Sequence, residues 1–114
     1  MRGYRQGVAS EISTPPRPVC DVVQDEAGYS AELSVEWPLE VNEVAAFEDA
    51  ASGLPPTVSS RDGQVIRGLV SVDDETLFVY VHATGPGRYD TAAAASAEQV
   101  LDGLWRLVQE QARR

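Results

Sequence analysis

The side chains best suited to acid–base or nucleophilic chemistry are few and stand far apart in the sequence. His82 is the only histidine and Cys20 the only cysteine. A general acid or base at His82 would need a carboxylate partner, which Glu32 or Glu36 could supply from the same face of a sheet. Cys20 is followed by Asp21, and an adjacent negative charge does not favour the thiolate that a nucleophile needs. Neither residue lies in a catalytic motif.

Metal ligands show no recognised spacing. A single histidine and a single cysteine cannot form a zinc site of the usual kinds. The acidic run Asp73-Asp74-Glu75 offers too few ligands for a calcium loop and is typical of a solvated turn. We therefore expect neither a metal ion nor a cofactor.

A glycine-rich connector is the weakest of the candidate sites. Thr84-Gly85-Pro86-Gly87-Arg88 precedes an expected helix, and backbone N–H groups near Gly87 with the Arg88 guanidinium could hold an anion there. The segment lacks the lysine and the glycine spacing of a phosphate-binding Walker loop. The alternative interpretation is a plain strand-to-helix connector.

Composition indicates one folded domain with an acidic surface. The chain has 114 residues, 43% of them hydrophobic and 24% charged, with a formal net charge of -9 and arginine as its only strongly basic residue type. This charge disfavours nucleic acid and anionic membranes as partners. No window approaches the roughly 18 apolar residues of a membrane span. A single cysteine excludes an intrachain disulfide and fits a cytoplasmic location.

The composition of the first part of the chain predicts a tail followed by a short β-rich run. Residues 1–18 are rich in Gly, Ser and Pro and carry three arginines against one glutamate, a composition typical of a flexible tail. The alternative is a basic arm that docks on an acidic neighbour. Val19-Cys20-Asp21-Val22-Val23 is either an edge strand or an ordered part of this tail.

A strand and a helix come next. Apolar and polar residues alternate from Tyr29 to Trp37, which predicts a strand with one buried face. Pro38 ends that strand. A helix is expected from about Leu39 or Asn42 to Ser52, closed by Gly53 and two prolines.

The rest of the chain predicts two hairpins and a long helix. Asp62-Gly63 joins strands over 57–61 and 64–72, because this pair favours a two-residue turn. A further strand is expected over 76–84, and a helix from a cap at Asp90 or Thr91 to near Arg113. Gly103 lies inside that helix, where a close approach by a neighbouring element would offset its cost.

These elements define an α+β fold. Their order is β-α-β-β-β-α, with a possible extra N-terminal strand. We expect a two-layer sandwich, in which an antiparallel sheet of three to four strands carries two helices on one face. Residues 1–18 would form the flexible tail and residues 19–114 the single domain, with Trp37 and Trp105 on its core faces.

The element order over about residues 29–110 resembles that of the small, dimer-forming, KH-like subunit of the KEOPS tRNA-modification complex. The segment Val35-Glu36-Trp37-Pro38 before the first helix adds to this similarity. The resemblance implies a two-layer fold that forms dimers. It carries no signature residue over to this chain, and the acidic composition departs from that of an RNA-binding surface.

The main candidate site is a face of the strand over 76–84. Leu77, Val79 and Val81 alternate with Phe78, Tyr80 and His82, so that both faces are largely apolar. If the aliphatic face meets the helices, the other face is open. The expected binding residues are Phe78, Tyr80, His82, Leu69, Arg67 and Val65. A homodimer, a small-molecule groove or a cover formed by the N-terminal segment could each shield this patch. The remaining alternative is that the patch is only modestly exposed.

We expect a non-catalytic interaction module or accessory subunit, which forms a homodimer or binds a larger protein. The alternative is a small enzyme or small-molecule-binding protein with a pocket at His82, in which Tyr80, Arg67 and Glu36 supply the other polar groups. The third hypothesis is a KH-like or nucleic-acid-associated subunit, which would bind nucleic acid through the basic tail or the loop at Gly87 and Arg88.

Overall fold

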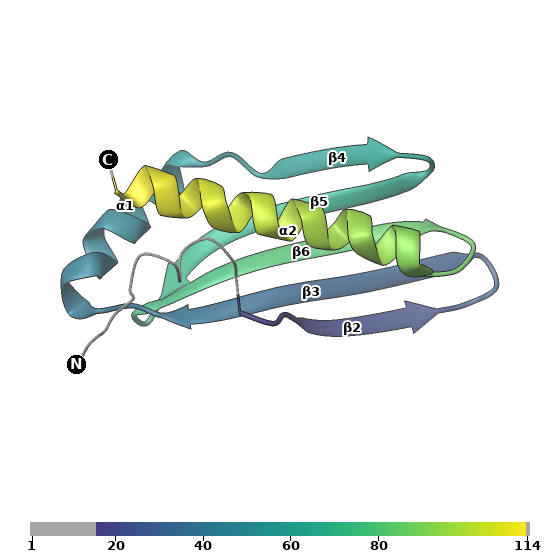
Figure 1. Cartoon of the computed structure of the whole chain (residues 1–114), viewed down its shortest axis with the longest axis horizontal. Helices are drawn as coiled ribbons and strands as arrows, with labels where there is room; N and C mark the ends of the chain where they lie inside the picture. Colours follow the sequence, from purple (N-terminus) through teal and green to yellow (C-terminus); the bar gives the residue numbers. More distant parts are fainter. Residues whose placement is uncertain (1–15, 114) are drawn as a thin grey trace.

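A computed structural model describes residues 16–113. Its five strands form one antiparallel sheet in the order β2-β3-β6-β5-β4, and two α-helices complete the α+β fold (Figure 1). The elements in chain order are β2 (Val19–Gln24), β3 (Gly28–Pro38), the short 3-10 helix η2 (Val41–Glu43), α1 (Val44–Gly53), β4 (Thr57–Arg61), β5 (Gln64–Asp73), β6 (Thr76–Pro86) and α2 (Thr91–Ala112). Of the expected tail, residues 1–15 lie outside the described residues.

The sheet has one more strand than the three to four expected from the sequence. The β-rich run at Val19 forms the edge strand β2, which pairs with β3 from Val19 opposite Ser34 to Gln24 opposite Tyr29. The order is therefore β-β-α-β-β-β-α. Every residue of β2 is exposed, so the strand has no buried face whose alternation could have identified it.

Two tight hairpins join β4, β5 and β6. Asp62 and Gly63 have φ values of 53° and 85°, as a type I′ turn requires, so the turn predicted at this pair is confirmed. Asp74 and Glu75 form the second turn with φ values of 50° and 59°, although neither is glycine. The Leu39 N–H donates to the Glu75 carbonyl oxygen at 2.9 Å, which ties this turn to the segment after β3.

Both expected helices are present. The segment before α1 begins with a capping box, in which the Glu40 N–H donates to the Glu43 carboxylate at 3.0 Å. The α-helix itself starts at Val44, slightly later than predicted, because a 3-10 turn occupies Val41–Glu43. At α2, the Asp90 carboxylate accepts a hydrogen bond from the Ala93 N–H at 2.9 Å, the cap that the sequence predicts.

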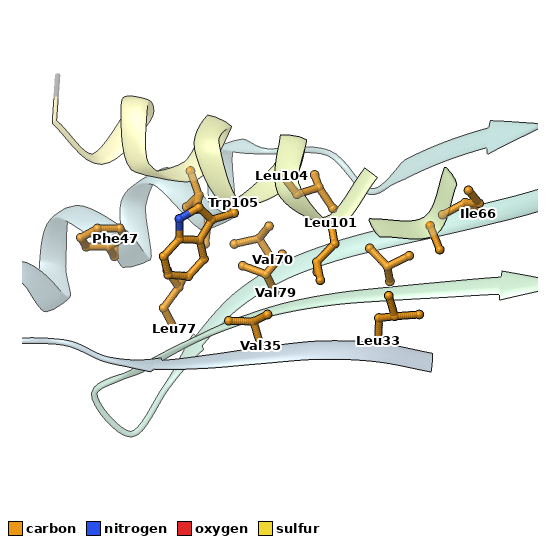
Figure 2. Close-up of a cluster of buried hydrophobic side chains, with 14 of the residues drawn as sticks. Leu33, Val35, Phe47, Ile66, Val70, Leu77, Val79, Leu101, Leu104 and Trp105 are labelled. Carbon is orange, nitrogen blue, oxygen red and sulfur yellow. The ribbon is translucent and has the colours of Figure 1, made fainter. Parts of the chain in front are cut away.

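The hydrophobic core lies between the helices and one face of the sheet. Leu77, Val79, Val81 and Ala83 of β6 have 0% exposure, and α2 packs across β3, β5 and β6 while α1 packs on β5 and α2. Trp105 points from α2 toward the sheet above Leu77 (Figure 2). It meets Trp37 edge to face at a centroid distance of 5.5 Å.

Two glycines, one on α2 and one on β5, have opposite surroundings. No close approach by a neighbouring element offsets the cost of Gly103, because nothing lies within 4 Å of the position of a Cβ there and the residue is exposed. Gly68 on β5 is the site of close approach instead. A Cβ on Gly68 would collide with the Cδ1 atom of Leu104, so this glycine lets α2 lie close to the sheet.

We predict that the same substitution at these two glycines changes stability in opposite directions. Gly103→Ala should raise the free energy of unfolding by about 1 kcal/mol, because alanine is the better helix former. Gly68→Ala should lower it by about 1–3 kcal/mol through overpacking against Leu104. Urea denaturation of the two variants beside the parent chain measures both changes. A loss of stability at Gly103 would contradict the open surroundings of that residue.

Candidate functional site

The outer face of the sheet is the face that the helices leave open (Figure 1). Side chains alternate along β6, so Leu77, Val79 and Val81 point into the core while Phe78, Tyr80 and His82 lie on the opposite, outer face and are half-buried. The neighbouring strands β3 and β5 add their own outward side chains. The structure thus brings together the six residues that the sequence analysis chose for binding.

Strand register sorts these side chains into cross-strand rows. In each row, a residue of β3 and one of β5 flank a residue of β6. The three central rows are Glu36–Phe78–Ser71, Ser34–Tyr80–Leu69 and Glu32–His82–Arg67. The rings of Phe78 and Tyr80, both half-buried, therefore follow one another along the middle of the outer face. We call this pair of rings the ridge; shorter or more polar side chains lie on both sides of it.

Exposed aliphatic side chains flank this ridge. Leu69 is 52% exposed and Val58, which pairs with Arg67 from the edge strand β4, is 65% exposed. On the other edge, Val19 and Val23 of β2 are 69% and 65% exposed and pair with outward residues of β3. Scattered exposed aliphatics are ordinary, but here they share one face with a ridge of aromatic rings.

Sequence reasoning missed the contributions of both edge strands. Val58 could have been found by counting back from the Asp62-Gly63 turn, because a two-residue turn fixes the register of its hairpin. Val19 and Val23 could not, since their side depends on the pairing of β2, which the sequence left open.

Charge is divided unequally between the two halves of the outer face. Asp21 of β2 pairs with Glu32 of β3, and Glu36 lies further along the same strand. The β5–β4 half carries the cation Arg67, with Asp73 at the far end of β5. The ridge on β6 thus separates an acidic half from a half with a basic centre.

His82 forms a hydrogen bond with a hydroxyl group. The Ser30 hydroxyl oxygen is 2.8 Å from the His82 Nε2 atom. Among the described residues, neither Glu32 nor Glu36 makes the hydrogen bond to this ring that a catalytic carboxylate partner would make. A hollow of about 290 Å³ opens beside the ring and is lined by Val65, Arg67, His82 and Thr84. Its guanidinium and imidazole groups could contact a small polar ligand.

Tyr80 has a shifted pKa that reflects its place on the ridge. Partial burial raises the pKa of the Tyr80 phenol, and the hydrogen-bonding carboxylate of Glu32 and its negative charge raise it further. The acidic half of the face therefore reaches the ridge, and Tyr80 stays neutral at physiological pH.

The loop at Gly87 and Arg88 is held by a side chain from β2. Gln24 donates to the Gly87 carbonyl oxygen at 2.7 Å and accepts from the Tyr89 N–H at 3.0 Å. The second bond occupies the Tyr89 N–H group, a donor that an anion in this loop would use. Arg88 lines a hollow of about 210 Å³ together with Arg61, Asp62 and Asp90, so the two guanidinium groups of this hollow lie near two carboxylates. The anion site stays a prediction, while the segment does connect the end of β6 at Pro86 to the start of α2 at Thr91.

Cys20 lies away from the outer face. It is exposed on β2 and lines a groove of about 660 Å³ between residues 16–20 and α2, together with Glu98 and Asp102. Burial raises the pKa of the nearby Tyr89 to about 12, with contributions from Cys20 and Glu98. This tyrosine therefore offers the thiol a neutral phenol and not a general base.

We predict that Glu32→Gln lowers the pKa of Tyr80. The substitution removes the negative charge that disfavours the phenolate, while the burial of the ring remains, so the pKa should fall without returning fully to that of a free phenol. Titration of the ring carbon signals of Tyr80 by NMR measures this change. Glu36→Gln is the matched control, because Glu36 lies beside Phe78. An equal shift in both variants would contradict the specific Glu32 contact.

Comparison of the chain with protein families, with curated proteins and with solved structures gives no match. Within residues 16–113, no three His, Cys, Asp or Glu side chains gather where they could hold a metal ion. No helix in the same range is both long and apolar enough to cross a membrane. The surfaces of the chain itself are therefore the basis for inferring its function.

Proposed function

We propose that this protein is a non-catalytic interaction module or accessory subunit that associates with itself through the outer face of its sheet. The observation that carries this proposal is the ridge of Phe78 and Tyr80, flanked by the exposed side chains of Leu69, Val58 and Val19. Aromatic rings beside aliphatic groups are the composition that protein interfaces favour at their centre.

The size of the outer face fits an interface between two copies. Strands β3, β5 and β6 are 11, 10 and 11 residues long, and the shorter β2 and β4 extend the sheet on both sides. With strands about 4.8 Å apart and about 3.4 Å per residue, the face covers on the order of 700 Å². Each partner of a standard protein interface contributes about 800 Å².

Several features of the outer face support binding over catalysis. His82 forms a hydrogen bond with Ser30. Cys20 lies on the helix side of β2, away from the outer face. Binding of nucleic acid would need a basic surface. The centre of this face instead carries three carboxylates, those of Asp21, Glu32 and Glu36, and a single cation, Arg67.

A second candidate function rests on the hollow beside His82. Its volume of about 290 Å³ and its lining by Arg67 and His82 suit a small anionic or polar ligand. Thermal melting of the protein with inorganic phosphate and with small carboxylic acids tests this reading. A rise in melting temperature that His82→Ala removes would favour it, and unchanged melting with every probe would count against it.

We predict that the parent chain sediments as a dimer of 12.3 kDa subunits at micromolar concentration and that Tyr80→Glu shifts it to the monomer. The new carboxylate would have to lose its water in the centre of the interface, which costs several kcal/mol for an unpaired charge. Sedimentation velocity, with circular dichroism to confirm folding, measures this effect.

The matched control is Leu107→Glu, which places the same charge on an exposed apolar side chain of α2. This variant should remain dimeric. A parent chain that is monomeric throughout the micromolar range, or dissociation caused by Leu107→Glu instead of Tyr80→Glu, would overturn the proposed function.

A further inference from the structure

The row Glu32–His82–Arg67 crosses the middle of the outer face. His82 lies next to Val81, at the midpoint of β6, and the register places Glu32 on one side of it and Arg67 on the other. The row therefore presents an anion, a ring and a cation in that order. Such an arrangement is complementary to a copy of itself turned over so that its two ends exchange places.

We propose that two copies pack outer face to outer face about a twofold axis that runs along β6, so that Glu32 of each copy pairs with Arg67 of the other. This inference rests on the proposed function and adds the arrangement of the partner. Rotation about such an axis carries β3 of one copy over β5 of the other at the same level along the strands. Glu32 of the partner subunit then faces Arg67, and the β6 ridges meet on the axis.

The other twofold arrangement of the two faces is electrostatically unfavourable. A twofold axis perpendicular to the strands would leave each β3 facing the partner's β3 and each β2 facing the partner's β2. The carboxylates of Asp21, Glu32 and Glu36 from both copies would then gather in one half of the interface. Like charges brought together on desolvation cost several kcal/mol, whereas the axis along β6 places the acidic half of each copy over the half that holds Arg67.

Glu32 and Arg67 do not pair with each other in this structure. They flank β6 from the two neighbouring strands, so their backbones are about 10 Å apart. Both are exposed, and neither forms an ion pair within the described residues. Glu32 contacts the Tyr80 phenol of its own chain, but that phenol is neutral, so both charges remain available to a partner.

Curvature of the sheet does not disturb this pairing. Facing sheets of a sandwich cross at about 30° because each sheet is twisted, so side chains far from the axis lose their alignment. The Glu32–His82–Arg67 row lies at the middle of β6, where a rotation displaces side chains least. The paired charges are also one strand away from the axis on either side, close to the centre of the buried area.

Charge reversal at the two positions, singly and in a mixture, tests the arrangement. Arg67→Glu alone and Glu32→Arg alone should each weaken dimerisation at least tenfold, because each places two like charges opposite each other twice per dimer. An equimolar mixture of the two variants should form a heterodimer close to the parent affinity, since both charge pairs are then restored across the interface. Sedimentation velocity of each variant and of the mixture measures the dissociation constants. Arg106→Glu and Glu98→Arg on α2 are matched controls and should leave the dimer intact.

The outcomes separate this inference from the proposed function. A parent chain that never dimerises removes both. A parent dimer that Tyr80→Glu dissociates, but in which Glu32→Arg tightens association, identifies the axis perpendicular to the strands, because the substitution then relieves repulsion between acids. A parent dimer in which mixing the two variants gives no recovery also overturns the pairing while the proposed function stands. Circular dichroism of each variant confirms that weakened association does not come from misfolding.

Discussion

The alternation of side chains along β6 is the constraint on which the rest of the structure depends. β6 is the middle strand of the sheet, with β3 on one side and β5 on the other. Its aliphatic residues must point toward α1 and α2, because Leu77, Val79 and Val81 are the centre of the only large core that the described residues form. A pleated strand cannot bury one face without presenting the other. The core therefore determines that Phe78, Tyr80 and His82 stand on the outer face.

The packing of the helices on one side leaves the outer face with a mixed character. Gly68 allows α2 to approach β5 closely, and Trp105 fills the space above Leu77 and meets Trp37. Nothing comparable covers the opposite side of the described residues. There the aromatic ridge separates the carboxylates of β2 and β3 from Arg67 on β5. An open sheet face with this division of charge is suited to a second copy of itself, and this property underlies both proposals.

Most of the fold follows from patterns in the sequence. The nine-residue alternation from Tyr29 to Trp37, the Asp62-Gly63 turn and the Asp90 cap each correspond to the expected element, because each is a local signal with its own physical cause. The sequence does not decide whether residues 19–24 form the strand β2, because all of them are exposed and the position of the strand depends on pairing with β3. The surroundings of Gly103 are equally hidden from the sequence, because a glycine's neighbours are set by tertiary packing, and here nothing lies within 4 Å.

The candidate site was only partly accessible from the sequence. The outward group of Phe78, Tyr80 and His82 follows from the period of β6, and the β5 residues follow from the hairpin that joins the two strands. The row that joins Glu32 to Arg67 across His82 needed the register of β3 against β6, which links strands that are distant in sequence. The hydrogen bond between Ser30 and His82 depends on the same register. Long-range pairing of this kind has no local signature.

The most direct measurement of the central claim is an isotope-filtered NOE experiment on a mixture of labelled and unlabelled chains, which detects contacts only between subunits. Dimerisation through the outer face should give intermolecular NOEs from the ring protons of Tyr80 and the methyl groups of Leu69, and none from the methyl groups of Leu107 on α2. Intermolecular NOEs confined to the helices, or none at a concentration where the protein is dimeric, would contradict the claim that a second copy covers the outer face.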